Sequence, residues 1–404
     1  MQRVLVLGGG FAGLWSAVGA ARKLDELGVG ADQVDVTLVS SSPWHSIRVR
    51  NYEAELGSTR LPLDEILRPI GVGRVEAEVV DIDFDRRQVV CSGRSDPLPY
   101  DRLVFALGSR LARPAIPGLA TFAFDVDTYD AASRLNRHIA GLPNRKPSPG
   151  RDTVLVIGGG LTGIEAAAEM PAKLGAAFGA QKDAPWRVIL ADHKAWIGSD
   201  MGSEARPVID EALRALAIEA RPGVSVAAID EAGATLATGE RIAAETVVWC
   251  AGMQAHPLTA RFPVERDRFG RIPVAADLKV LGMAAEFAAG DVAWFAIDGH
   301  KSCVMSCQHG RPMGRYAGHN AVADLLGLPT LPLVIPWYTT ILDLGAWGAV
   351  YTEGWDRHLV SSGAAAKRTK MVINQQRIYP PRSGVRAEIL AAGAPVVQTA
   401  PARL

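Results

Sequence analysis

The chain is poor in cysteine, balanced in charge and without a long apolar run. Its 404 residues contain 4 cysteines, which is too few for a disulfide framework and favours a reducing compartment. Lysine plus arginine number 43, as do aspartate plus glutamate, so the overall charge gives no reason to expect a nucleic-acid partner. The most apolar stretch, 331–351, is interrupted by two prolines, two glycines and an aspartate, so no segment reaches the roughly 18 apolar residues that a membrane span needs. We therefore expect a cytoplasmic protein, at most peripheral at the inner face of the membrane.

Metal chemistry also has little support. The 8 histidines are scattered along the chain, and the spacing Cys303-x-x-x-Cys307 has no second pair to complete four ligands. No metal site is therefore predicted, and the two cysteines are interpreted as packing residues.

What the sequence does contain is one glycine-rich motif in two copies. Each copy follows a short apolar run and precedes an alanine-rich helical stretch, with glycines at Gly8, Gly10 and Gly13 and again at Gly158, Gly160 and Gly163. In such a motif the first glycine makes a tight turn, the second lets the backbone approach a pyrophosphate, and the third lets the helix pack on the strand. The helix N-terminus then faces the phosphates with its partial positive charge. Two copies predict two bound dinucleotides, of which a flavin and a nicotinamide dinucleotide are the obvious pair.

The residue at the end of the second strand of each unit bears on which nucleotide binds. An acid in this place usually accepts hydrogen bonds from the adenosine ribose and repels a 2′-phosphate. The second unit has Asp192 there, which favours NAD over NADP, while Lys194 nearby weakens the preference. The first unit has Ser40, whose hydroxyl can still bond a ribose.

The order of predicted elements indicates an α/β protein with two Rossmann-like dinucleotide-binding domains. Residues 17–28 and 129–142 are predicted helices, 34–39 and 100–109 predicted strands, and 76–84 with 86–92 a predicted antiparallel pair. We place the first part of one domain at 1–118, the second domain at 119–265, the return of the first at 266–330 and a C-terminal α+β interface segment at 331–404. This last segment is rich in tryptophan and tyrosine, which suits a cover over a cofactor or the face of a homodimer.

Taken in order, the motifs resemble those of a known class of proteins. Besides the two glycine fingerprints they are Ala106-Leu107-Gly108-Ser109, Cys250-Ala251-Gly252 and Phe287-Ala288-Ala289-Gly290-Asp291. This order resembles the two-dinucleotide-binding-domain flavoproteins of the pyridine nucleotide-disulfide oxidoreductase superfamily, over about residues 1–330. Within that class the chain is most similar to the type II NADH dehydrogenase-like branch, on Pro43-Trp44-His45, Thr162-Gly163-Ile164-Glu165 and Val247-Val248-Trp249-Cys250.

The resemblance implies FAD in the first domain and NADH in the second. Hydride would pass from the nicotinamide to the flavin, and electrons from there to an acceptor, usually a quinone. The implied contacts with the two cofactors are Gly8, Gly10, Phe11, Ala12, Gly13, Ser40, His45, Ala106, Gly108, Ser109, Gly158, Gly160, Gly163, Asp192, Gly252, Gly290 and Asp291. Two catalytic residues are implied, Glu165 to tune the flavin or relay a proton and Gln308 at the pyrimidine end of the flavin.

The acceptor side departs from the family pattern. Quinone-reducing members have a second glutamine four residues after the first, whereas Gln308 is followed by Pro312 at that place. A typically apolar stretch contains Arg48 and Arg50, which are interpreted as partners of nearby glutamates, with an anionic acceptor as the alternative.

A loose basic stretch near the C-terminus, which begins at Lys367 and includes Lys370, is interpreted as a solvated face.

With no evident membrane anchor, three alternatives to a quinone reductase stay open. The first is a soluble flavoprotein reductase for a protein or small non-quinone acceptor. The others are a flavin oxidase or dehydrogenase with its own organic substrate, and a non-catalytic nucleotide sensor. Disulfide reduction is not expected, because residues 42–50 contain no cysteine.

Overall fold

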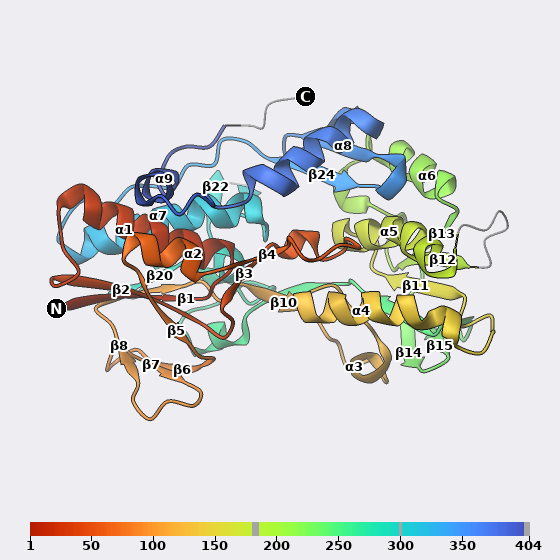
Figure 1. Cartoon of the computed structure of the whole chain (residues 1–404), viewed down its shortest axis with the longest axis horizontal. Helices are drawn as coiled ribbons and strands as arrows, with labels where there is room; N and C mark the ends of the chain where they lie inside the picture. The colour runs from red at the N-terminus through yellow and green to blue at the C-terminus, as the bar shows by residue number, and fades with distance from the viewer. Residues whose placement is uncertain (180–185, 299–300, 400–404) are drawn as a thin grey trace.

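The first glycine motif belongs to a parallel sheet assembled from distant parts of the chain. The computed structural model describes residues 1–179, 186–298 and 301–399 (Figure 1). The first sheet has the order β20-β9-β1-β2-β5, and each neighbouring pair is parallel. Its strands are β1 (Gln2–Leu7), β2 (Val34–Ser40), β5 (Gly73–Glu76), β9 (Arg102–Phe105) and β20 (Glu286–Ala288). Parallel strands are covered on both faces, which explains the nearly continuous apolar sequence of β1.

Helices cover one face of this sheet, and a small antiparallel sheet lies on the other side (Figure 1). α1 (Phe11–Leu27) packs along α7 (Cys307–Leu325), and glycine permits the close approach, because a Cβ on Gly318 would lie 1.9 Å from the Ser16 carbonyl oxygen. α2 (Asp64–Leu67) and α9 (Arg386–Ala392) lie on the same side. The antiparallel sheet consists of β6 (Val79–Asp83), β7 (Gln88–Cys91) and β8 (Leu98–Pro99).

The second glycine motif belongs to a second parallel sheet, of order β13-β12-β11-β17. Its strands are β11 (Thr153–Ile157), β12 (Arg187–Asp192), β13 (Ile218–Pro222) and β17 (Thr246–Trp249). α5 (Leu161–Phe178) and α4 (Tyr129–Gly141) pack against each other on one face of it. Its other elements are α3 (Leu119–Phe122), α6 (Arg206–Ala215) and an antiparallel sheet of β14 (Val226–Asp230), β15 (Gly233–Leu236) and β16 (Arg241–Ala243).

Short elements join the two halves and extend the first. β10 (Ser109–Leu111) pairs with β18 (Met253–Ala255) between the two sheets. The remaining short strands form three pairs: β3 (Trp44–Ser46) with β4 (Arg60–Pro62), β19 (Ile272–Pro273) with β21 (Ala293–Trp294), and β22 (Ala296–Asp298) with β23 (Lys301–Ser302).

The part of the C-terminal segment that spans residues 339–372 lies over the second half, whereas α9 packs on α1 in the first (Figure 1). Its antiparallel sheet consists of β24 (Thr339–Asp343), β25 (Ala349–Glu353) and β26 (His358–Ser362). The chain then forms α8 (Gly363–Val372), which continues into one π-helical turn, Ile373–Arg377. α5 packs against β24, so this segment contacts the helix of the second glycine motif.

The predicted fold class is confirmed, since both glycine motifs connect a strand of a parallel sheet to a helix. Three predicted bounds are wrong. The strand predicted over 100–109 is shorter, because β9 ends at Phe105 and Ser109 begins the separate strand β10. The first helix begins at Phe11 rather than at residue 17, and Glu76 ends a strand of the parallel sheet instead of starting the antiparallel pair. The boundaries at 118, 265 and 330 stay predictions. Among the described residues, no helix is both long enough and apolar enough to cross a membrane.

Candidate cofactor and acceptor site

The first glycine loop leaves room in front of the N-terminus of α1. A Cβ on Gly13 would lie 1.8 Å from the Gly8 carbonyl oxygen, so only glycine permits this contact between helix and turn. Gly8 has φ +109°, a conformation that favours glycine. Around Gly10, by contrast, a Cβ would meet no atom within 4 Å. The open space beside Gly10 is where a phosphate group can reach the helix N-terminus.

A cavity of about 530 Å³, the first cavity, extends from this loop. Its lining includes most of the residues predicted to contact FAD: Gly8, Gly10, Phe11, Ala12, Ser40, Ala106, Gly108, Ser109, Gly290 and Asp291. Gly13 and His45 are not part of the lining and lie behind the loop. The cavity therefore gathers residues from both separated parts of the first domain.

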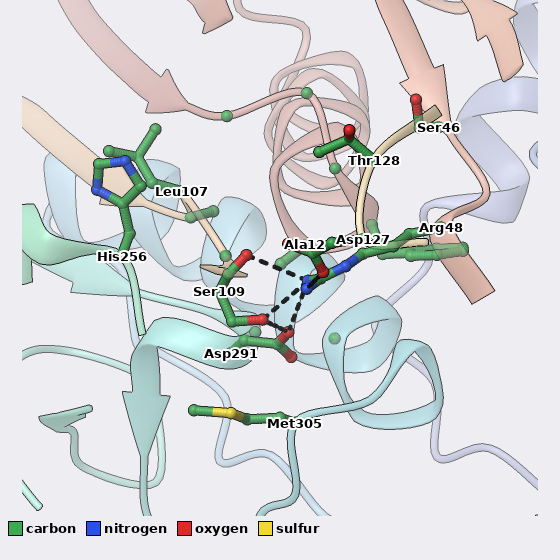
Figure 2. Close-up of a pocket in the computed structure, with 18 of the residues that line it drawn as sticks. Ala12, Ser46, Arg48, Leu107, Ser109, Asp127, Thr128, His256, Asp291 and Met305 are labelled. Atoms are coloured by element: carbon green, nitrogen blue, oxygen red, sulfur yellow. Dashed lines mark hydrogen bonds and ion pairs between the residues drawn. The ribbon is translucent and has the colours of Figure 1, made fainter. Parts of the chain in front are cut away.

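A polar cluster closes one side of the first cavity (Figure 2). The Ser109 hydroxyl donates a 2.6 Å hydrogen bond to Asp291, and Arg48 donates to the same hydroxyl at 2.9 Å. Arg48 also pairs with Asp127, and its Nη1 lies 3.9 Å from the Asp291 carboxylate. Burial raises the pKa of Asp291, while the Ser109 hydrogen bond and the Arg48 charge oppose the rise.

Arg48 and Arg50, the two arginines of the stretch that is typically apolar in the family, have different partners. Arg50 pairs with Glu53 at 2.6 Å and donates to the Tyr379 hydroxyl at 2.6 Å, so its predicted structural role is confirmed. Arg48 was expected to pair with the same group of glutamates, and this is wrong, because its side chain turns to Ser109 and Asp127. The sequence did not indicate the contacts of Arg48 with Ser109 and Asp127, because each joins residues that are 61 or more positions apart.

His45 supports the glycine loop from behind. Its Nδ1 lies 2.9 Å from the Gly9 carbonyl oxygen, and the edge of its ring meets Phe11 with ring centres 5.1 Å apart. The side chain is fully buried, and burial lowers its pKa from 6.5 to about 4. The neutral ring therefore donates its Nδ1 proton to the Gly9 carbonyl.

This buried histidine predicts acid sensitivity. Between pH 6.5 and about 4 the unfolded chain binds a proton at His45 that the folded chain does not bind. Above pH 6.5 this group therefore does not lower the free energy of unfolding. As the pH falls below 6.5 the free energy of unfolding decreases, by about 2 kcal/mol at pH 5. His45→Gln keeps a donor for Gly9 and does not titrate. We expect its thermal midpoint to fall less between pH 7 and pH 5 than that of the wild type; equal slopes would contradict a neutral buried ring.

The second glycine loop has the same close backbone contacts as the first. A Cβ on Gly163 would lie 1.7 Å from the Gly158 carbonyl oxygen, whereas a Cβ on Gly160 would meet nothing within 4 Å. Asp192, at the end of β12, accepts hydrogen bonds from the backbone N–H groups of Gly159 and, at 2.7 Å, Lys194. The Lys194 ammonium pairs with Asp200 at 2.8 Å. The predicted strand-end acid thus lies directly under the loop, and the nearby cation has a partner of its own.

A second cavity, of about 460 Å³, adjoins the first. Thr162, Cys250 and Cys307 are among the residues that line both cavities. The second cavity also contains four predicted site residues, namely Gly160, Glu165, Gly252 and Gln308. Its other walls come from the C-terminal segment, including residues 339–341 and Lys370.

A buried ion pair lies in the wall of the second cavity. The Lys370 ammonium is 2.7 Å from Glu165 and also donates to the Ile341 carbonyl oxygen at 3.0 Å. The backbone N–H of Asp343 donates to Glu165 at 3.0 Å. Burial raises the pKa of Glu165 although Lys370 opposes the rise, while burial would lower the pKa of Lys370 and the Glu165 charge raises it overall.

The interpretation of the basic C-terminal stretch as a solvated face is wrong for two of its residues. Lys370 is buried, and Lys367 pairs with Asp343. Both lie in α8, which was not predicted, and the spacing of Lys367, Lys370 and Asn374 is the one signal of a shared helix face.

The sequence also singles out Gln308 and the cysteines near the two cavities, and in the part of the chain that the structure describes their side chains contact backbone groups or have no hydrogen-bond partner. The Gln308 amide donates to the Thr339 carbonyl oxygen at 2.9 Å and accepts from the Thr339 N–H at 3.3 Å, when its nitrogen faces that carbonyl. Cys303 is buried and donates to the Ala293 carbonyl oxygen at 3.3 Å, in keeping with a packing role. Burial raises the pKa of the Cys307 thiol, and raises the pKa of Cys250 to about 12, so both are thiols rather than thiolates at neutral pH.

Comparisons with known proteins agree with this arrangement. Residues 2–314 match the family described as pyridine nucleotide-disulphide oxidoreductase. The chain belongs to this family. It is 57% identical to an NADH dehydrogenase-like protein of Mycobacterium tuberculosis, over 99% of this chain and 100% of that protein. It is 25% identical to a type II NADH:quinone oxidoreductase of Staphylococcus saprophyticus, over 94% and 95% of the two chains.

A solved structure extends the agreement to the fold. NDH2 of Plasmodium falciparum in complex with NADH has a TM-score of 0.79 at 14% identity, covering 97% of each chain. The predicted superfamily is thus confirmed, as is the expectation of an NADH-dependent FAD oxidoreductase.

Proposed function

We propose that this oxidoreductase passes the electrons of NADH to an acceptor of the quinone class. The observation that carries the proposal is that the two cavities share a wall. The first cavity is lined by the first glycine loop, and the second cavity is bordered by the second glycine loop, so the two proposed nucleotide sites adjoin. FAD, when bound in the first cavity, supplies the two-electron chemistry between the two substrates. The name of the Staphylococcus saprophyticus relative, a type II NADH:quinone oxidoreductase, supports the same acceptor class.

The residues of the first cavity fit FAD. The open space beside Gly10 suits the pyrophosphate, and Ser40 at the end of β2 suits the adenosine ribose. Ser109 and Asp291, oriented by Arg48, would hold the ribityl hydroxyls. In the second half, Gly160 and Asp192 would hold the NADH pyrophosphate and ribose.

Glu165 and Lys370 would handle the remaining proton. Reduction of a quinone to a hydroquinone takes up two electrons and two protons, and the hydride of NADH supplies both electrons and one proton. The second proton must come from the protein or solvent. Glu165 has a raised pKa and a buried ammonium beside it, so the pair can hold and return a proton at the second cavity. Gln308 would orient the acceptor side through its contact with β24.

Anaerobic stopped-flow mixing tests the proposed function. We expect NADH to bleach the flavin absorbance of the purified holoenzyme quickly and NADPH slowly, because Asp192 disfavours a 2′-phosphate. Adding 1,4-naphthoquinone to the reduced enzyme should then restore the oxidised spectrum in a single turnover. Absence of bleaching by either nucleotide would contradict the first step, and bleaching without reoxidation would contradict the quinone acceptor.

Gly160→Ala tests NADH binding without disturbing the fold. The alanine Cβ meets no atom within 4 Å, and the φ of −81° at this position suits alanine, so the variant should fold and retain FAD. The methyl group occupies the space in front of α5, so bleaching at limiting NADH should slow by about tenfold or more. A wild-type bleaching rate would show that NADH does not approach this loop.

A further inference from the structure

The second cavity carries an excess of positive charge. Its charged lining residues are Arg48, Glu165, Arg311, Lys370 and Arg377. Arg48 is paired with Asp127, and Lys370 is paired with Glu165. Arg311 and Arg377 have no carboxylate partner in the described residues, so two cations on the acceptor side are uncompensated.

Arg311 is the more deeply enclosed of the two. It lies one turn into α7, and its Nε is buried without a hydrogen-bond partner. In residues 1–179, 186–298 and 301–399 its guanidinium makes no hydrogen bond or ion pair, and its carbon lies 5.3 Å from the centre of the Trp15 ring. Burial and, to a smaller extent, the nearby Arg377 charge lower its pKa to about 10, yet the group is still a cation at neutral pH.

Arg377 ends the π-helical turn that follows α8 and faces the same cavity. Its Nη2 donates to the Thr399 carbonyl oxygen at 2.7 Å, and its guanidinium carbon lies 6.0 Å from the centre of the Trp337 ring. A carbonyl and an aromatic ring do not neutralise a charge. Two like charges that meet at a partly closed cavity repel each other, and an anion between them would relieve the repulsion.

We propose that the acceptor carries an anionic group, such as a carboxylate, a sulfonate or an ionised ring hydroxyl, and that Arg311 binds this group with help from Arg377. The inference rests on the proposed function and narrows its acceptor class from quinones in general to anionic ones. The overall step stays balanced: NADH, one proton and the quinone give NAD⁺ and the hydroquinone, and the anionic group keeps its charge. Arginine suits such a group because its planar fork can bind two oxygens at once.

Arg315 offers a matched control on the same helix. It also has a buried, unpartnered Nε and lies over the Trp15 ring, at 4.3 Å, but it does not line the second cavity. We compare Arg311→Gln and Arg315→Gln for turnover of NADH with 1,4-naphthoquinone and with 1,4-naphthoquinone-2-sulfonate. Arg311→Gln should lower kcat/KM about tenfold or more for the sulfonate and less than about twofold for the neutral quinone. Arg315→Gln should leave the ratio of the two values unchanged.

An equilibrium measurement separates binding from turnover. The redox-inactive pair 2-naphthalenesulfonate and 2-naphthalenesulfonamide differs in charge, and quenching of tryptophan fluorescence in the holoenzyme reports their binding. We expect Arg311→Gln to raise the Kd of the sulfonate about tenfold and to leave that of the sulfonamide unchanged. Equal effects of Arg311→Gln on both members of either pair would overturn the proposal. Failure of NADH to bleach the flavin would contradict the proposed function alone, because the sulfonate binding still tests Arg311.

Discussion

Lys370→Met is expected to cause the largest loss of stability and turnover among single changes at the site. The Glu165 carboxylate would stay buried but lose Lys370, the one cation that pairs with it in the part of the chain that the structure describes. Removing one partner of such a pair costs about 3–5 kcal/mol. The loss should be largest at high pH, because a buried acid with a raised pKa is neutralised as the pH falls. The thermal midpoint of the holoenzyme at pH 8 and at pH 5 measures the effect.

Two further variants test whether the loss of stability and turnover in Lys370→Met comes from breaking the Glu165–Lys370 pair. Glu165→Gln with Lys370→Met removes both charges and keeps an acceptor for the Asp343 N–H, so stability should largely return. Turnover with 1,4-naphthoquinone should stay reduced by about a hundredfold, because the proposed proton donor is gone and solvent would have to replace it. Lys367→Met is the control, since that partly exposed lysine pairs with Asp343 and its loss should cost less. A double variant with the full stability loss, or with wild-type turnover, would refute these roles.

Gly10→Ala is expected to give a folded protein without flavin. At this position φ is −75° and ψ is −169°, which alanine adopts readily, and its Cβ would meet no atom of the chain within 4 Å. The methyl group would instead occupy the space in front of α1, where the backbone has to approach the pyrophosphate of FAD. The purified variant should be colourless, with the circular dichroism of a folded chain and a Kd for added FAD raised about a hundredfold or more.

Gly13→Ala is the contrasting change in the same loop. Its Cβ would lie 1.8 Å from the Gly8 carbonyl oxygen, so helix and turn would have to separate. We expect this variant to be insoluble or to unfold at a much lower temperature, whether or not FAD is added. A yellow Gly10→Ala protein, or a stable Gly13→Ala protein, would contradict the distinct roles assigned to the two glycines.

The glycine motifs could be recognised from sequence because their chemistry is local. Gly8, Gly10 and Gly13 follow one strand within six positions, and the turn, the open phosphate site and the helix contact all involve neighbours in the chain. The same holds for Asp192, whose hydrogen bonds reach the loop that the parallel pairing of β11 and β12 places beside it. Alternating or continuous apolar patterns in the strands also predict the two sheets.

The acceptor side could not be recognised in this way because its contacts join distant segments. Lys370 meets Glu165 across 205 residues, and Arg48 meets Ser109 across 61. A basic run such as 367–370 is usually solvated, and only the packing of α8 over β24 and β25 buries one of its lysines, next to Glu165 of α5. The second cavity likewise has walls from the second glycine loop, α7 and the C-terminal segment.

The amino-acid sequence therefore determined the two nucleotide-binding units, their order and the class of chemistry, since these depend on residues within a few turns of each other. Only the tertiary structure decided which charges are paired at the acceptor side. Pairing there depends on which side chains the fold buries together, and burial turns Glu165 and Lys370 into a coupled pair while it leaves Arg311 without a counter-charge in the described residues.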